Sequence, residues 1–180
     1  MKKIFFLFIL FSAVAFGQQN FNIDNRQIYW QKIYDTANND SNHLANIFSG
    51  SGKITIDEKS PTGFSGIVKD FVMDYKGAGS SFMATPGYLN EQNKYSANYT
   101  VEIKDNRYRV TVTNIRLKGL DLNYGMIRTD GNENLEEYAL TNSRDAFKKR
   151  FLGKEAKIVD YSFSQLFDAS KFKDQKKSDW

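Results

Sequence analysis

Tyr-Thr-Val-Glu-Ile-Lys-Asp-Asn-Arg-Tyr-Arg-Val-Thr-Val-Thr-Asn-Ile-Arg-Leu-Lys, residues 99–118, is the stretch that decides the fold. Apolar and polar residues alternate on both sides of a central Asp-Asn pair, which is the pattern of two strands that each bury one face. A two-residue turn at this pair places three apolar pairs opposite one another. These pairs are Ile103 with Tyr108, Val101 with Val110 and Tyr99 with Val112. A shift of one residue would set every apolar side chain opposite a polar one, so the pattern predicts an antiparallel hairpin with one register.

The second strand of this hairpin changes face after its middle. The apolar residues of this strand occupy even-numbered positions up to Val112, but Ile115 and Leu117 occupy odd-numbered positions. One extra residue in a strand produces such a change, so we expect a β-bulge or the end of pairing near Thr113 and Asn114.

Residues 1–17 have the composition of an export signal. Two lysines precede an apolar run over residues 4–16, and small residues stand at the −3 and −1 positions before Gln18. The run is too short to span a bilayer comfortably, and no cysteine is present to carry a lipid anchor. We therefore expect a soluble protein exported to the periplasm or the cell exterior, without stable membrane insertion after cleavage. An uncleaved membrane anchor is the alternative.

The composition excludes several classes of chemistry. The absence of cysteine removes disulfides, thiolate nucleophiles and cysteine-ligated metals. The formal net charge is +4, and two of these charges leave with the leader, so net charge favours neither nucleic acid nor acidic membranes as partners. We expect no cofactor.

Before the hairpin, the sequence predicts strands separated by a helix and turns. Residues 27–35 read as a strand with apolar side chains on both faces, including Tyr29 and Ile33, which is typical of a strand covered on both sides. The other expected segments are a polar lead-in at 18–25, a helix from a cap at 38–41 through Phe48, strands at 53–58 and 64–75, and an irregular stretch at 76–94 that can hold a functional loop.

After the hairpin, the sequence predicts helices. Residues 120–141 read as a loop with helical character near 135–140. The i, i+4 pair of Phe147 and Phe151 indicates a helix over 142–152 that ends at Gly153. A last helix begins at an Asp160 cap and buries Phe163, Leu166 and Phe167, and a charged tail covers 171–180.

This order of elements, around the Lys-Asp-x-Arg-Tyr-Arg motif of residues 104–109, resembles a bacterial exported domain of unknown function with a TATA-binding-protein-like fold. The likeness covers about residues 26–119 and includes the first strand at 28–34, the helix at 44–48 and Tyr88-Leu89. It implies an α+β domain in which helices pack on one face of a curved antiparallel sheet. It implies no activity, and the fold name does not imply DNA binding. We expect one such domain over 26–170, with residues 120–170 as a helical extension.

The residues that catalysis or metal binding requires are sparse. The one imidazole, His43, lies in a predicted surface helix without a nucleophile pattern near it. The run from Asp130 to Asn134 resembles a calcium loop, but Leu135 and Thr141 stand where that loop needs Gly and Glu. The basic run 148–150 reads as a solvated helix face. Asp35-Thr36-Ala37 resembles an acceptor tripeptide for O-glycosylation.

A binding surface is the hypothesis that remains. The outward face of the hairpin carries Glu102, Lys104, Arg107 and Arg109. The adjoining irregular stretch and strand carry Phe82, Tyr88 and Tyr95. Aromatic residues and arginine are the types that protein-recognition surfaces favour. The alternative is that these charged residues only form the solvent-exposed face of a sheet and bind no partner.

We therefore expect a non-enzymatic module that binds a protein or peptide partner in the cell envelope. If the second hairpin strand is an edge of the sheet, we expect a peptide partner to bind by adding a strand beside it. The alternatives are a periplasmic enzyme or calcium-dependent protein that uses carboxylate and oxygen ligands, and a small-molecule carrier with a cavity between sheet and helices.

Overall fold

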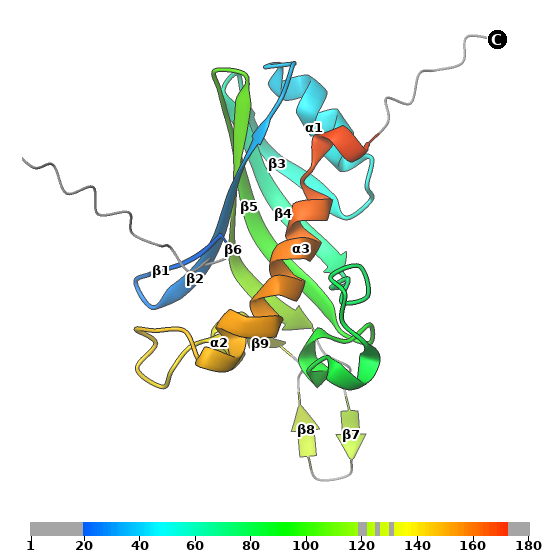
Figure 1. Cartoon of the computed structure of the whole chain (residues 1–180). Helices are drawn as coiled ribbons and strands as arrows, with labels where there is room; N and C mark the ends of the chain where they lie inside the picture. The colour runs from blue at the N-terminus through cyan, green and yellow to red at the C-terminus, as the bar shows by residue number, and fades with distance from the viewer. Residues whose placement is uncertain (1–19, 119–121, 125–126, 130–131, 173–180) are drawn as a thin grey trace, which may run out of the picture.

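The computed structural model describes residues 20–172, apart from residues 119–121, 125–126 and 130–131. Within these ranges the chain forms a seven-stranded sheet in the order β1-β2-β6-β5-β4-β3, with β9 paired to the end of β6 (Figure 1). The strands are β1 (Phe21–Asp24), β2 (Gln27–Asp35), β3 (Ile54–Ser60), β4 (Gly63–Phe71), β5 (Lys94–Lys104), β6 (Arg107–Lys118) and β9 (Asn132–Asn134). The short strands β7 (Leu122–Tyr124) and β8 (Ile127–Thr129) pair with each other.

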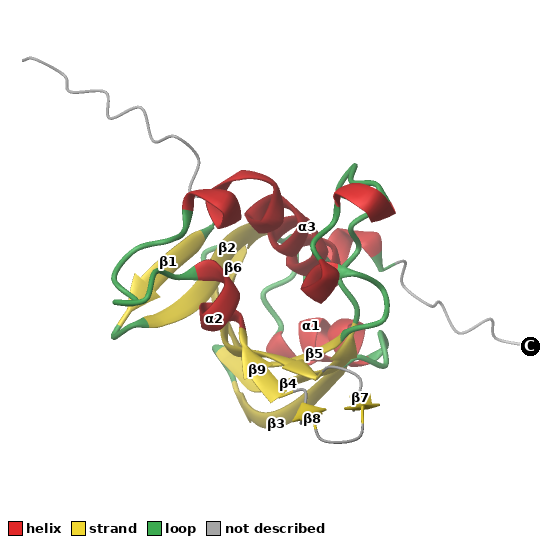
Figure 2. Ribbon diagram, turned by 90° about the horizontal axis from the view of Figure 1, so that it is seen from below, coloured by secondary structure: helices red, strands yellow, loops and turns green. Residues whose placement is uncertain are grey.

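The helices lie on one face of this sheet. They are α1 (Ser41–Ser49), α2 (Leu135–Ala139) and α3 (Ala156–Leu166). Figure 2 shows the sheet as an arc whose hollow holds the three helices. Every pairing between neighbouring strands of the sheet is antiparallel. The α+β class, with helices on one face of a curved antiparallel sheet, is therefore confirmed.

The hairpin formed by β5 and β6 has the predicted register. Ile103 pairs with Tyr108, and the two apolar pairs that follow are also as expected. Asp105 and Asn106 have φ of 50° and 57°, as the two central residues of a type I′ turn require. The predicted bulge is also present, because Asn114 has a φ of 50° and the register shifts beside it.

The N-terminal part of the fold differs from expectation in two places. The leader predicted for residues 1–17 lies outside the described residues. Residues 21–24, expected in a polar lead-in, form β1, because Phe21 is buried with its ring centroid 5.4 Å from that of Phe151. Ile33 is 57% exposed, so the prediction that β2 is covered on both faces is wrong. The helices pack only in the hollow of the sheet, which leaves the outward side chains of β2 in solvent.

The helix expected over residues 142–152 is also wrong in its boundaries. Its first residues form turns and bends, and Phe147 pairs with Leu140 in an isolated β-bridge. Helical structure begins only at Lys149. The aromatic pair is nevertheless formed, with the rings of Phe147 and Phe151 stacked at 5.5 Å.

Gly153 and Asp160 are neither a helix stop nor a helix cap. Gly153 lies inside a continuous helical segment, where its ψ of −109° produces a kink before α3. Asp160 lies in the middle of α3, and its Oδ1 accepts hydrogen bonds from Trp30 Nε1 and Asn20 Nδ2, both at 2.7 Å. The carboxylate therefore ties α3 to the start of the described chain and to β2.

Phe167, at the end of α3, is the centre of the core. Its side chain is fully buried, as are Phe163 and Leu166 of the predicted apolar stripe. The centroid of its ring lies 5.4 Å from that of Tyr99 and 5.8 Å from that of Phe48. Its carbonyl oxygen accepts a hydrogen bond of 2.8 Å from the Tyr108 hydroxyl. One residue thus joins α3 to α1 and to both central strands.

Replacing Asp160 with alanine is expected to lower the free energy of unfolding by about 1–3 kcal/mol, because the indole N–H of the buried Trp30 loses its acceptor. Asp160→Asn retains a carbonyl acceptor and is the milder matched change. The free energy of unfolding of each variant is measured by urea denaturation, monitored through tryptophan fluorescence. Equal unfolding midpoints for the wild type and Asp160→Ala would contradict the assignment.

The buried tyrosines predict a loss of stability at high pH. Burial raises the pKa of Tyr108 to about 12, and it raises the pKa values of Tyr34 and Tyr99 further above their usual value. Because the folded state favours the neutral phenol, this stabilisation is complete below about pH 10 and is lost as the pH rises through 12. Ultraviolet titration of phenolate, alongside circular dichroism, is expected to show late ionisation coupled to unfolding. Ionisation of every tyrosine near pH 10 without unfolding would contradict this prediction.

Candidate functional site

Three of the predicted binding residues line one depression at the tip of the hairpin. Lys104, Arg107 and Arg109 surround a volume of about 590 Å³ at the end of β5 and β6, at the top of Figure 1. The other lining residues are Ile33, Thr62, Glu102, Ile103, Asp105 and Tyr108. Three strands and the β3–β4 turn contribute to this surface, which we call the hairpin-tip surface.

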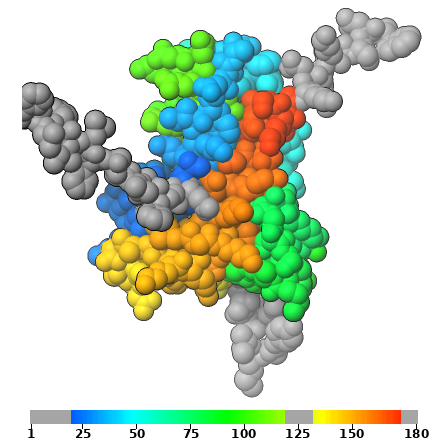
Figure 3. Space-filling model, viewed as in Figure 1, coloured from blue at the N-terminus to red at the C-terminus, as the bar shows by residue number. Residues whose placement is uncertain are grey.

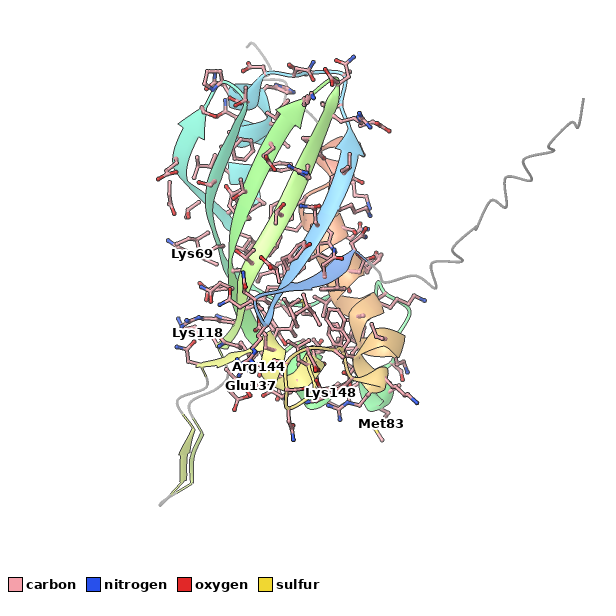
Figure 4. All side chains as sticks on the ribbon, turned by 90° about the vertical axis from the view of Figure 1, so that its left-hand side faces the viewer. Lys69, Met83, Lys118, Glu137, Arg144 and Lys148 are labelled. Atoms are coloured by element: carbon pink, nitrogen blue, oxygen red, sulfur yellow. The ribbon has the colours of Figure 1, made fainter. Side chains whose placement is uncertain are left out.

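Strand register places the outward side chains of this surface in two rows. In the first row, Ile33 of β2 lies opposite Arg109 of β6, and Arg109 lies opposite Glu102 of β5. In the second row, Arg107 lies between Asp35 and Lys104. Figure 4 views the sheet from this outer side. Because the inward residues that alternate with these side chains are fixed in the core, the positions of both rows are fixed as well.

The two arginines differ in their electrostatic surroundings. Arg109 Nε lies 2.9 Å from Glu102 Oε2, and a second nitrogen of the same guanidinium lies 2.7 Å from that oxygen. Both side chains are about half exposed, so this pair adds little stability. Arg107 forms no ion pair within the described ranges. Lys104 approaches Asp105 only at 3.9 Å. Arg107 and Lys104 are therefore available to carboxylates of another molecule.

A glycine continues the hairpin-tip surface toward β3. Gly63 lies opposite Glu102 at the start of β4, and a second depression of about 260 Å³ lies over it. A Cβ at Gly63 would lie 2.1 Å from the Val101 carbonyl oxygen, so β4 can approach β5 this closely only with glycine here. Thr62 and Glu102 line both depressions.

Tyr88 and Tyr95 lie away from this surface. They are only 8% and 1% exposed. The Tyr88 hydroxyl donates to Oε2 of the buried Glu155 at 2.8 Å, and the Tyr95 hydroxyl donates to the Tyr88 carbonyl oxygen at 2.5 Å. The Tyr88 phenol fastens the irregular segment between β4 and β5 to the helical segment before α3, and the Tyr95 phenol fastens the same irregular segment to β5. The structure thus brings together the charged candidates and places the aromatic ones in the core.

Sequence reasoning identified one of the exposed apolar residues, Phe82, and missed Ile33 and Met83. Ile33 was assigned to a covered face, and only the pairing of β2 with β6 shows that it lies over Arg109. Phe82 and Met83, in a 3₁₀ turn between β4 and β5, are 55% and 91% exposed. The irregular composition of 76–94 was the available signal for this segment, and it indicated Phe82 but not Met83.

Strand addition at β6 does not occur in this topology. β6 is paired with β5 on one side and with β2 and β9 on the other. The edge strand on the far side of β4 is β3, whose register shifts between Ile56 and Glu58 and which carries charged residues there. A bulge and charges are common protections of a sheet edge.

Other candidate chemistries have little support in the described residues. His43 is a partly buried residue of α1. Across 20–172, outside the gaps, no group of three acidic or imidazole side chains is placed to hold a metal ion. The calcium-like run of 130–134 begins outside the described residues. No helix among those described is long and apolar enough to span a bilayer.

Comparison with known proteins gives two structural neighbours. No family profile matches the sequence, and no curated protein matches it. The chain is similar to a solved DUF4468 family protein from Bacteroides ovatus, with 14% identity, a TM-score of 0.47, and coverage of 84% of this chain and 88% of that one. It is also similar to a TBP-like protein from Parabacteroides distasonis, with 15% identity, a TM-score of 0.45, and coverage of 83% and 96%. Both descriptions agree with the resemblance noted in the sequence.

Removing the Tyr88 hydroxyl is expected to destabilise the protein. In Tyr88→Phe, Oε2 of the buried Glu155 loses its hydrogen bond from the Tyr88 hydroxyl. The other carboxylate oxygen, Oε1, forms an ion pair with Arg150 Nε at 2.9 Å but accepts no hydrogen bond within the described residues. The free energy of unfolding should fall by about 1–3 kcal/mol in urea denaturation. Tyr29→Phe, on the outer face of β2, is the matched control and should have no effect. Equal stability of the two variants would contradict the assigned role.

Proposed function

We propose that this chain is an exported, non-enzymatic module that binds an envelope protein through the hairpin-tip surface. The observation that carries the proposal is the exposure of Ile33 beside two arginines, one of which has no ion pair in the described structure. A partly exposed apolar residue with flanking arginines is a common composition of a protein-binding site.

The charges of this surface favour a partner with carboxylates near an apolar side chain. Arg107 and Lys104 lie in adjacent strands and can accept one acidic residue between them. Ile33 lies one row away and can pack against an aliphatic or aromatic side chain. The fixed strand positions reduce the entropy lost on binding. Export rests on the leader predicted for residues 1–17.

The alternative is that these charges only solvate the outer face of the sheet. That alternative accounts for Glu102 and Arg109, which neutralise each other. It assigns no role to Ile33, which is 57% exposed and lies opposite Arg109. The two explanations differ in whether substitutions at the tip alter the capture of a partner.

Combined substitution of Ile33→Ser and Arg107→Glu is expected to reduce partner capture about tenfold or more. The measurement is in-cell chemical crosslinking followed by mass spectrometry, with Lys104 as the expected crosslinked residue. Lys69→Glu is the matched control, because it makes the same kind of charge change on an exposed residue of β4 far from the tip (Figure 4).

Unchanged capture by the double variant would contradict the site. Recovery of the monomer alone, at crosslinker doses that capture known neighbours of other envelope proteins, would contradict the proposed function. Circular dichroism of the variants shows whether their fold is intact.

A further inference from the structure

Four exposed cations lie on the helical segment that leads into α3. Lys149, Arg150, Lys154 and Lys157 are all exposed. Of these, only Arg150 forms an ion pair within the described residues, with the buried Glu155. Residues 144–157 contain six basic and two acidic residues, so this segment alone carries as much net charge, +4, as the whole chain. The net charge of the whole chain therefore understates how basic residues 144–157 are.

Three exposed apolar side chains belong to the same region. Leu152 is 40% exposed and lies between Arg150 and Lys154 in the sequence, next to the kink at Gly153. Phe82 and Met83, in the loop between β4 and β5, are 55% and 91% exposed. Phe82 and Met83 are adjacent in the sequence, and neighbouring exposed apolar side chains rimmed by polar residues mark an interaction site more often than scattered single ones do.

The loop and the helical segment form one surface. The Tyr88 hydroxyl bonds to Glu155, and the backbone N–H of Asp74 donates to Ser162 Oγ at 2.8 Å. Figure 3 shows the loop, in green, bordering the helical segment, in orange, at the lower end of the molecule. Figure 4 shows that Met83 and Lys148 both lie toward that end, opposite the hairpin tip. We call the four cations and three apolar residues the loop–helix surface.

We propose that the loop–helix surface docks on an anionic lipid bilayer. Apolar side chains that enter the boundary between headgroups and acyl chains, flanked by lysine and arginine that stay at the headgroups, are the arrangement by which peripheral proteins bind membranes. The charge of the surface is complementary to anionic headgroups. A soluble acidic partner would satisfy the cations but gives no reason for Met83 to protrude. No spanning segment is required.

Vesicle sedimentation tests this proposal. The protein should begin at Gln18, because the apolar run of residues 4–16 would itself bind lipid, while every described residue is retained. At low salt we expect sedimentation with vesicles of equal parts phosphatidylglycerol and phosphatidylcholine, and not with phosphatidylcholine alone. Binding should weaken as salt is added.

Two pairs of substitutions separate the charged and apolar contributions. Lys154→Gln with Lys157→Gln is expected to weaken vesicle binding about 25-fold, because each lysine near an anionic surface contributes about a fivefold gain. Phe82→Ser with Met83→Ser should weaken it about tenfold or more. Lys69→Gln, on the outer face of the sheet and outside both proposed surfaces, should leave vesicle binding unchanged.

Three results would overturn the proposal. These are no binding to the anionic vesicles at low salt, equal binding to neutral vesicles, and binding that the Phe82 and Met83 substitutions leave intact. The last result would assign the cations to an acidic macromolecule instead of lipid. Circular dichroism verifies the fold of each variant. Because Phe82, Met83, Lys154 and Lys157 belong to the end of the molecule opposite the hairpin tip, the outcome is independent of the protein partner proposed above.

Discussion

The packing of Phe167 in the hollow of the sheet is the constraint on which the rest of the structure depends. Its ring meets aromatic side chains of β2, α1 and β5, and its carbonyl oxygen accepts the hydroxyl of Tyr108 on β6. The three strands that Phe167 contacts, β2, β6 and β5, are consecutive in the sheet order, and curvature of the sheet turns their inward side chains toward the one ring. Burial of that ring, and of Trp30 beside it, therefore favours the curved sheet, and curvature leaves one face for helices and the other for solvent.

The same packing determines what the outer face can present. Side chains alternate along a strand, so fixing Trp30 and Tyr108 inward fixes Ile33 and Arg109 outward. Cross-strand register then places Arg109 beside Glu102 and leaves Arg107 without an ion pair in the described structure. The arrangement of the hairpin-tip surface is thus a consequence of the core, and its side chains are presented from paired strands, where less freedom is lost on binding than in a loop.

Local features of the fold could be predicted from the sequence, and features that join distant segments could not. The Asp105-Asn106 turn determines the hairpin register through contacts between near neighbours, and the parity change at Asn114 marks the bulge. The exposure of Ile33 depends on which strand lies beside β2, and β6 is more than seventy residues away. Asp160 follows the pattern of a helix cap, but its carboxylate bonds to Trp30, which no local pattern indicates. For the same reason the sequence could not show that Tyr88 is buried and not an exposed aromatic residue, since its hydrogen-bond partner Glu155 lies 67 residues further along the chain.

The two proposed surfaces lie at opposite ends of one rigid sheet, and this separation has a mechanical consequence. The strands β5 and β6 run from the hairpin tip toward the end where the loop between β4 and β5 meets the segment before α3 (Figure 1). The hydrogen bond from Tyr88 to Glu155 fastens that loop to the helical segment, and the one from Tyr95 to the Tyr88 carbonyl oxygen fastens it to β5, so the loop is held to both the helical segment and the sheet. If lipid holds the loop–helix surface, the hairpin tip points away from the bilayer, at a distance set by the length of an eleven-residue strand. Two binding surfaces on one stiff body can therefore hold a protein partner at a defined height above a membrane without any spanning segment.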